Sequence, residues 1–393
     1  MEEWKTYKIG NLCSISSSKR IFAKEYQSSG IPFFRGKEII EKQKGESVST
    51  ELYISKSRYD EIKNKFGVPK EGDMLLTSVG TLGIPYIVKN ETFYFKDGNL
   101  TWFTDFKEIN SKFLYYWFSS PIAKNAINAK AIGSTQKALT IDALSKFEID
   151  IPNIDTQNRI VSILSSLDSK IELNRRINDN LEQQAQAWLN ELLDRYANST
   201  TVLIHEIAEI NPKRNLSKGT SAKCIEMANL PTTGSFPNGW IEKEYNGGMK
   251  FCNGDTLIAR ITPCLENGKT AFINFLDKNE IAYGSTEYIV ISAKSNYSSS
   301  FFYFLARNHD FVDYAVKNMN GSSGRQRVSG DTISKYRIPV IPREKLESFT
   351  NHAEIALKTI KNNSLQNMRL SMTRDALLPK LMSGELKVND LNS

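Results

Sequence analysis

The sequence has 393 residues, of which 40% are hydrophobic and 24% charged, so it is long enough for two or three domains with buried cores. Its 51 basic and 44 acidic residues give a net charge of +7, which is compatible with a polyanionic partner without establishing one. The sequence has no run of about 18 apolar residues that would predict a membrane span, and its polar N-terminus predicts no signal peptide. The four cysteines show no CxxC spacing and the three histidines are scattered. We therefore expect a cytoplasmic protein with no membrane contact and no metal site.

One unit of sequence occurs twice along the chain. Four short matches appear in the same order, and their offset grows slowly from 182 to 189 residues, as small loop insertions would cause. The matched pairs are Gly72–Leu76 with Gly254–Ile258 (offset 182), Gly98–Thr101 with Gly284–Glu287 (186), Phe113–Tyr116 with Phe301–Phe304 (188) and Asp142–Phe147 with Asp331–Tyr336 (189).

Each copy has the same order of predicted elements. Short apolar runs broken by Gly, Pro and Asn, such as Ile84–Val88 and Tyr288–Ile291, predict strands. The aromatic-rich segments Phe113–Phe118 and Phe301–Leu305 predict a helix packed on the sheet. A glycine-bearing polar loop, a last strand ending in proline (Ile151-Pro152 and Ile341-Pro342) and a long helix complete each copy.

The long helices carry the pattern of a coiled-coil seam. From Thr156 to about Tyr196 there is no Pro or Gly, and apolar residues alternate at steps of three and four, which predicts a rod of about 60 Å. The second helix has the same pattern 189 residues later. Asparagines in the seam, which fix register at a cost in stability, are expected to meet where the helices pair: Asn174, Asn178, Asn363 and Asn367. In the alternative, each helix packs on its own domain and the asparagines are solvated.

The sequence shows no motif for chemistry of its own. It lacks the GxxxxGK[ST] loop that holds a nucleoside triphosphate. It also lacks the Asn-Pro-Pro-aromatic motif of amino-methyltransferases, because Asn211 and Pro212 are followed by Lys213. We therefore predict no catalytic residue and no enzymatic activity in this chain.

Two diverged copies of a globular domain, each followed by a long helix, resemble the specificity (S) subunit of type I restriction-modification enzymes. The segment Leu377–Leu386 is similar to the ending of that family, and Gly133–Gln136 and Thr262–Lys269 are further typical phrases. The resemblance covers essentially the whole chain. It implies an α+β fold in which two long helices, forming an antiparallel coiled coil, separate two similar mixed α/β target-recognition domains in a pseudo-two-fold internal repeat. The expected parts are residues 1–154 (first domain), 155–198 (first spacer helix), 199–342 (second domain) and 343–393 (second spacer helix and tail).

The resemblance also implies the partners. Each domain would read one half of an asymmetric bipartite sequence in double-stranded DNA, while the helices set the spacing and dock two methyltransferase subunits. Restriction–translocase subunits would join this core. S-adenosylmethionine would belong to the methyltransferase, and ATP with Mg²⁺ to the restriction subunit, so no cofactor is expected in this chain. The alternative is a protein-only coiled-coil scaffold with two binding domains, which predicts no salt-sensitive affinity for DNA.

Candidate DNA contacts follow from the chemistry of base edges, because Arg and Lys suit guanine whereas Asn and Gln suit adenine. The glycine-bearing loops are the best candidates, since glycine lets the backbone approach phosphates closely. We favour DNA contact by these loops over the alternative that they are only mobile surface loops. They offer Ser134, Thr135, Gln136 and Lys137 in the first copy and Ser322, Ser323, Arg325, Gln326 and Arg327 in the second. Further candidates are Arg35, Lys37, Ser78, Thr81 and Arg260, with Lys213 and Arg214 as phosphate contacts.

A first prediction concerns Gln136. Replacing it with alanine should relax base preference in one half of the bound sequence only, because a lost side-chain contact to a base edge costs about 1–3 kcal/mol of discrimination at that base. Binding to duplexes with single base-pair changes measures this effect. A uniform loss of affinity across all sequences would contradict base readout by Gln136.

Overall fold

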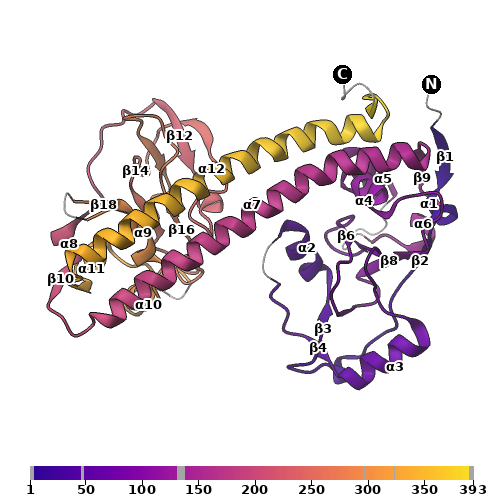
Figure 1. The fold of residues 1–393 in the computed structure, drawn as a ribbon, viewed down its shortest axis with the longest axis horizontal. Coiled ribbons are helices and arrows are strands. Elements are labelled where there is room, and N and C mark those ends of the chain that lie inside the picture. The colour runs from indigo at the N-terminus through magenta and orange to yellow at the C-terminus, as the bar shows by residue number, and fades with distance from the viewer. Residues whose placement is uncertain (1–3, 46–47, 131–137, 295–296, 323, 389–393) are drawn as a thin grey trace. The chain divides into compact units, whose positions relative to one another are not determined.

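The computed structural model describes residues 4–45, 48–130, 138–294, 297–322 and 324–388. The chain divides into two compact units, which are Met1–Glu172 with Arg369–Ser393, and Leu173–Met368. Two long helices, α7 (Ile154–Arg195) and α12 (Arg343–Met382), each contribute one part to the first unit and one part to the second (Figure 1). No described helix is both long and apolar enough to cross a membrane.

The first unit contains a four-stranded sheet in the order β2-β8-β5-β6, a three-stranded sheet in the order β4-β3-β7, and the pair β1-β9. Its strands are β1 (Lys5–Lys8), β2 (Ser14–Ser16), β3 (Ile31–Phe34), β4 (Tyr53–Ile54), β5 (Met74–Thr77), β6 (Pro85–Ile87), β7 (Tyr94–Phe95), β8 (Leu100–Thr104) and β9 (Glu148–Ile151). Its shorter helices are α1 (Ile9–Leu12), α2 (Gly36–Lys44), α3 (Lys56–Phe66), α4 (Ser111–Ser119), α5 (Pro121–Lys130) and α6 (Ile141–Ser145).

The second unit contains sheets in the orders β11-β18-β15-β16 and β13-β12-β17-β14, and the pair β10-β19. Its strands are β10 (Thr201–Leu203), β11 (Ala208–Ile210), β12 (Ser221–Ile225), β13 (Ile241–Glu244), β14 (Met249–Phe251), β15 (Thr256–Ala259), β16 (Thr270–Phe272), β17 (Ala282–Gly284), β18 (Tyr288–Ala293) and β19 (Arg337–Pro339). Its shorter helices are α8 (Ile204–Ile207), α9 (Ser299–Ala306), α10 (His309–Lys317) and α11 (Gly330–Ser334).

The repeat in the sequence is a repeat in the topology. The antiparallel order β2-β8-β5-β6 returns as β11-β18-β15-β16, and the pair β1-β9 returns as β10-β19. Both units also contain one parallel pair, β3 with β7 and β12 with β17. The second unit differs by carrying β14 at the edge of its second sheet.

The repeated Gly-Asp motif has the same structural role in both units. Asp73 accepts a hydrogen bond from the backbone N–H of Lys70 (3.0 Å), and Asp255 accepts one from Cys252 (2.7 Å). The glycine before each aspartate has a φ of 89° and 90°, a left-handed conformation that favours glycine. The motif therefore builds an identical turn in front of β5 and β15.

The strand ladders correct one of the four sequence matches. Thr77 of β5 pairs with Leu100, whereas the equivalent Ala259 of β15 pairs with Tyr288, so the offset on β8 and β18 is 188 rather than 186. The two glycines of that match lie in different places, because Gly98 lies in a turn and Gly284 is the last residue of β17. Asn99 is therefore the counterpart of Glu287, which the uncorrected match had paired with Thr101.

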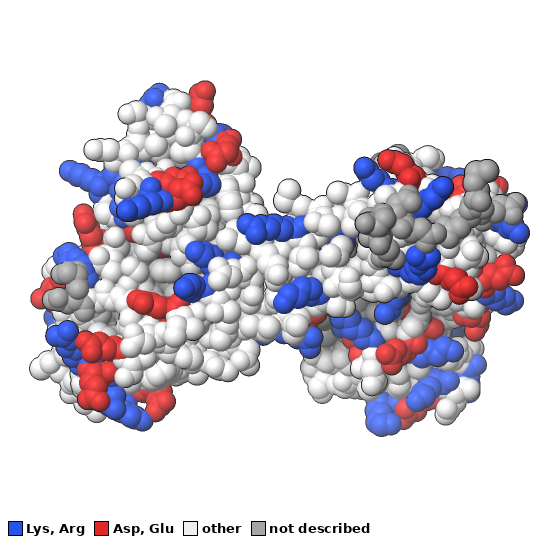
Figure 2. Space-filling model, turned by 45° about the horizontal axis from the view of Figure 1, so that its top comes forward, with Lys and Arg blue, Asp and Glu red and all other residues white. Residues whose placement is uncertain are grey.

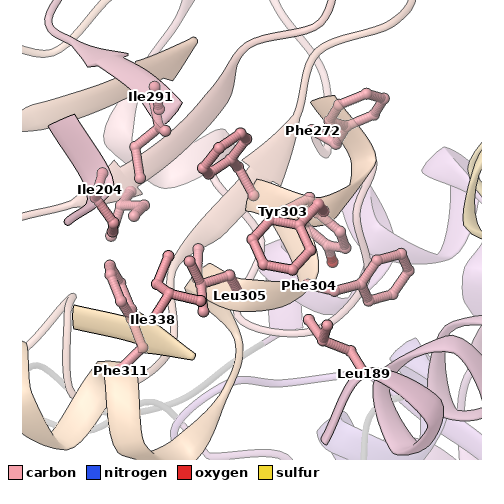
Figure 3. Packing of buried hydrophobic residues seen from close by; sticks show 14 of the residues in the cluster. Leu189, Ile204, Phe272, Ile291, Tyr303, Phe304, Leu305, Phe311 and Ile338 are labelled. Atoms are coloured by element: carbon pink, nitrogen blue, oxygen red, sulfur yellow. The ribbon is translucent and has the colours of Figure 1, made fainter. Parts of the chain in front are cut away.

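The core of the second unit centres on α9, which lies between the sheet and the long helices (Figure 3). Tyr303, Phe304 and Leu305 are fully buried there, with Leu189 of α7 on one side and Phe272 of β16 on the other. The aromatic segment predicted as a helix on the sheet is therefore confirmed. In the first unit the equivalent α4 buries Phe113, Leu114 and Trp117 and leaves Tyr115 partly exposed, so these aromatic residues belong to the core.

The two long helices pack on each other in antiparallel fashion. In the first unit, Arg374 of α12 donates to Asp168 of α7 (2.8 Å).

In the second unit the seam asparagines meet across the helices. Asn174 donates to Asn367, and Asn363 donates to Asn178, both at 2.8 Å. The internal repeat exchanges one of these hydrogen bonds for the other, because Asn174 corresponds to Asn363 and Asn178 to Asn367.

The helices also pack on the globular parts of the units, so both packings expected from the sequence occur together. Ala185 and Leu192 of α7 share one core with Phe349 and Ala353 of α12 and with the residues of α9. Asn174 has no exposed surface, which excludes a solvated role for this asparagine.

The C-terminal motif closes the core of the first unit. Leu378, Leu381 and Met382 are buried among the residues of α4 and β9. Gly384, with a φ of 73°, lies against the indole of Trp4, where an added Cβ would stand 3.0 Å from the ring. This close approach explains the glycine of the motif.

A second prediction concerns Asp255, which is 1% exposed and pairs with Arg214 at 2.7 Å. Asp255→Ala should lower the free energy of unfolding by about 3–5 kcal/mol, because it leaves a largely buried guanidinium without its partner. Urea unfolding of the purified chain measures the change. Glu226→Ala, which breaks the exposed pair with Lys243, is the control and should cost less than about 1 kcal/mol. Equal losses of unfolding free energy in the two variants would contradict the structural role of the buried Asp255–Arg214 ion pair.

Candidate DNA interface

Three segments of each unit meet at the end of the central strand, held by backbone hydrogen bonds. In the first unit, Ser78 N–H donates to the carbonyl of Asn99 (2.8 Å), and Leu139 N–H donates to the carbonyl of Ser78 (2.9 Å). In the second unit, Arg260 N–H donates to Glu287 and Val328 N–H donates to Arg260, both at 3.0 Å. We call each arrangement a junction.

The side chains of the two junctions differ at every position. The bridges Val79–Ala138 and Ile261–Arg327 make Ala138 the counterpart of Arg327. The first junction therefore consists of Ser78, Asn99 and Ala138, and the second of Arg260, Glu287 and Arg327.

The second junction is a charged cluster. Glu287 accepts two hydrogen bonds from Arg327 in a forked arrangement, at 2.8 Å from Nη2 and 2.9 Å from Nε, and one from Arg260 Nε at 3.2 Å. The hydrogen bonds from Arg327, and then those from Arg260, hold the pKa of Glu287 below its ordinary value against the opposing effect of burial. All three side chains are partly exposed, at 24–37%. The cluster is therefore fixed in place and still reachable from solvent.

The first junction is neutral, and its serine side chain is buried. The hydroxyl of Ser78 is buried and lies 2.5 Å from the hydroxyl of Thr101. Ser78 stabilises the sheet in this way, and its side chain is not available to a ligand in this structure. Asn99 remains partly exposed.

A cleft beside the first junction brings several predicted residues together. It lies between α2 and the turn after β5, and it is lined by Arg35, Gly36, Lys37, Ile40, Glu41, Lys44, Val79, Thr81 and Asn99. Arg35 is held by an ion pair with the fully buried Glu38 (2.7 Å), so its guanidinium is fixed at the rim. Lys37 is exposed, 3.6 Å from Glu41. The cleft is thus a mixed polar surface with a positive excess.

The glycine-bearing loops adjoin both junctions in the sequence. Ser134, Thr135, Gln136 and Lys137 lie outside the described residues, as does Ser323. Ser322, Arg325 and Gln326 are exposed, and the backbone carbonyl of Gln326 accepts a hydrogen bond from Thr262 (3.1 Å). Within the described part of the chain, Arg325 has no ion-pair partner.

The two predicted phosphate contacts have different environments. Arg214 is 17% exposed and donates to both carboxylate oxygens of Asp255 at 2.7 Å, which gives it a structural role. The structure therefore offers no support for phosphate binding by Arg214. Lys213 is exposed and remains a candidate.

Charge alone does not mark an interface. On the face drawn in Figure 2, acidic residues lie among the basic ones in both globular parts of the chain. Among the described residues, no group of three His, Cys, Asp or Glu side chains is placed to hold a metal ion. The junctions are therefore distinguished by their geometry rather than by a strong field.

Sequence reasoning missed Asn99, Lys44 and Glu287. Glu287 is acidic, a residue type not expected at a DNA surface, and the two-residue error in the sequence match concealed its equivalence to Asn99. A search for the residue that directly precedes the strand paired with β5 or β15 would have found Asn99 and Glu287.

Comparison with known proteins gives the class of this fold. Residues 1–183 match the family model of the Type I restriction modification DNA specificity domain. The crystal structure of the S subunit of a type I restriction-modification system from M. genitalium has a similar fold, with a TM-score of 0.62 over 96% of each chain and 16% identity.

The similarity extends along the whole chain. The sequence is 26% identical to the MjaIX type I restriction enzyme specificity subunit of Methanocaldococcus jannaschii, over 99% of this chain and 95% of that protein. It is 35% identical to S.HindORF215P of Haemophilus influenzae over 167 residues, which are 42% of this chain and 40% of that protein. Residues 1–183 thus match a type I restriction modification DNA specificity domain, and the chain as a whole is similar to a type I restriction enzyme specificity subunit.

A third prediction concerns Lys213. Lys213→Ala should weaken binding to all duplex sequences alike and reduce the slope of log affinity against log salt by about one, because one phosphate contact is lost. Titration of the chain with a fixed duplex at several salt concentrations measures the slope. Lys213→Arg keeps the charge and should leave the slope unchanged. A sequence-dependent loss would contradict a phosphate contact.

Proposed function

We propose that this chain is the non-catalytic DNA-reading subunit of a type I restriction-modification complex, in which each unit reads one half of an asymmetric bipartite sequence. The observation that carries the proposal is the recurrence of the junction. The same backbone hydrogen bonds hold three segments together in both units, while all three side chains differ.

The difference in side chains supports different half-sites. The second junction has two arginines, which suit the acceptors N7 and O6 of guanine. The first junction offers Asn99, whose amide suits adenine, beside the cleft that contains Arg35, Lys37 and Thr81. Two surfaces of such different chemistry would select different bases, so the bipartite target would be asymmetric.

The long helices supply the second part of the proposal, in which they set the spacing of the half-sites and dock two methyltransferase subunits. The asparagine pairs support a fixed helix register, because a seam residue that needs a polar partner disfavours slippage. The helices also expose apolar side chains that a partner would cover, such as Ile355 (67% exposed) and Met372 (71%). Restriction–translocase subunits would join the methyltransferase core. S-adenosylmethionine, ATP and Mg²⁺ would be bound by those partners.

The proposal is tested by sequencing modified bases in genomic DNA. Cells expressing this chain with its candidate methyltransferase subunit are compared with cells that lack only this chain. We expect a split, asymmetric methylated motif that disappears without the chain. If no motif depends on the chain, titration with duplex DNA at several salt concentrations separates an inactive partner from a protein-only scaffold, because a scaffold shows no salt-sensitive affinity.

A further inference from the structure

We propose that Arg260 is the residue with which the second unit selects a guanine and that Glu287 is its positioning residue, held in place by Arg327. This inference rests on the proposed function and makes it specific, since it assigns a G·C base pair to the half-site read by the second unit.

The geometry gives the two arginines different tasks. All three guanidinium nitrogens of Arg327 donate hydrogen bonds. Nε and Nη2 donate to Glu287, and Nη1 donates to the backbone carbonyl of Arg325 (2.9 Å). Arg260 donates to Glu287 through Nε only. Within the described part of the chain, Nη1 and Nη2 of Arg260 have no hydrogen-bond partner. The free pair of donors therefore belongs to Arg260.

That free pair matches one base. Two parallel N–H groups of a guanidinium donate to O6 and N7 of guanine in the major groove, whereas adenine presents a donor at the position of O6. A carboxylate on Nε leaves the terminal nitrogens exposed and restricts the rotation of the side chain. Less conformational entropy is then lost when the base is bound.

The backbone reinforces the placement of Arg260. Its N–H donates to the carbonyl of Glu287 and its own carbonyl accepts from Val328, so both main-chain groups are bound at the junction. Glu287 is fixed as well, since its N–H donates to the hydroxyl of Ser285 (3.1 Å). Arg260 and Glu287 are thus joined by backbone and side-chain hydrogen bonds together.

Arg327 keeps Glu287 compatible with DNA. A lone carboxylate at this surface would repel phosphates, and the forked pair with Arg327 balances its charge while leaving the charge of Arg260 in excess. The first unit needs no such balance, because Asn99 and Ala138 stand at the equivalent positions. Of the two junctions, the carboxylate is in the second, where Arg260 takes the position that Ser78 has in the first.

The experiment selects bound sequences from a pool of duplexes with randomised central base pairs, using the full chain. The variants are Arg260→Ala, Glu287→Gln and Glu287→Asp. For the wild type we expect a bipartite motif with a G·C pair favoured about tenfold or more at one position of one half-site. Arg260→Ala should abolish that preference, Glu287→Gln should weaken it at the same position, and Glu287→Asp should restore part of it. The other half-site should stay unchanged in all three variants.

Glu280→Gln is the matched control, because Glu280 lies in the same unit, is 23% exposed and pairs with Lys223 at 2.7 Å. It should leave the selected motif unchanged, and thermal unfolding checks that every variant is folded. An unchanged G·C preference in Glu287→Gln, or a uniform rise in affinity with the same motif, would overturn the role of Glu287 while leaving the proposed function intact. An unchanged motif in Arg260→Ala would overturn the assignment of the reading residue. Absence of any motif for the wild type would overturn the proposed function itself.

Discussion

Both units depend on two backbone hydrogen bonds at the end of the central strand. These bonds join the residue that follows β5 or β15 to the turn in front of β8 or β18 and to the segment in front of α6 or α11. Because main-chain atoms make them, they place no demand on the side chains at those positions. The same framework therefore presents serine, asparagine and alanine in one unit and arginine, glutamate and arginine in the other. A fold with this property can change what it contacts without changing how it is held together.

The pair of long helices is held in register by hydrogen bonds between side chains, in contrast to the backbone hydrogen bonds of the junctions. Asn174 is completely buried, and the N–H groups of its amide would be costly without partners, since a buried unpaired polar group costs about 1–3 kcal/mol. Hydrogen bonds to Asn367 and Gln366 satisfy its donors. A shift of either helix by one residue would break these bonds and the hydrogen bond from Asn363 to Asn178. Here the side chains determine the arrangement, whereas at the junctions the backbone does.

The sequence alone predicted the architecture well, because the architecture rests on repeated local patterns. The Gly-Asp turns, the aromatic helices and the seam asparagines each need particular residue types, and these types occur twice at a nearly constant offset. The candidate contacts were harder to predict because exposure depends on tertiary pairing. The side chains of Ser78 and Arg214 are chemically suited to contact DNA. However, Ser78 is buried against the sheet, and Arg214 forms an ion pair with Asp255. Glu287 escaped notice because strand register, which decides its equivalence to Asn99, is not visible in a four-residue match.

The division of the helices between the units has a consequence for the order of synthesis. The second unit is one continuous stretch, Leu173–Met368, whereas the first unit is completed by Arg369–Ser393. During translation the second unit can therefore close its core before the segment that completes the first unit is made. The first unit emerges earlier and must wait for Leu378, Leu381 and Met382, which follow the second unit in the sequence and fill the core of the first. The domain whose synthesis begins first is thus the one whose core is completed last, and a chain interrupted after Met368 would carry one complete domain and one whose apolar core stands open.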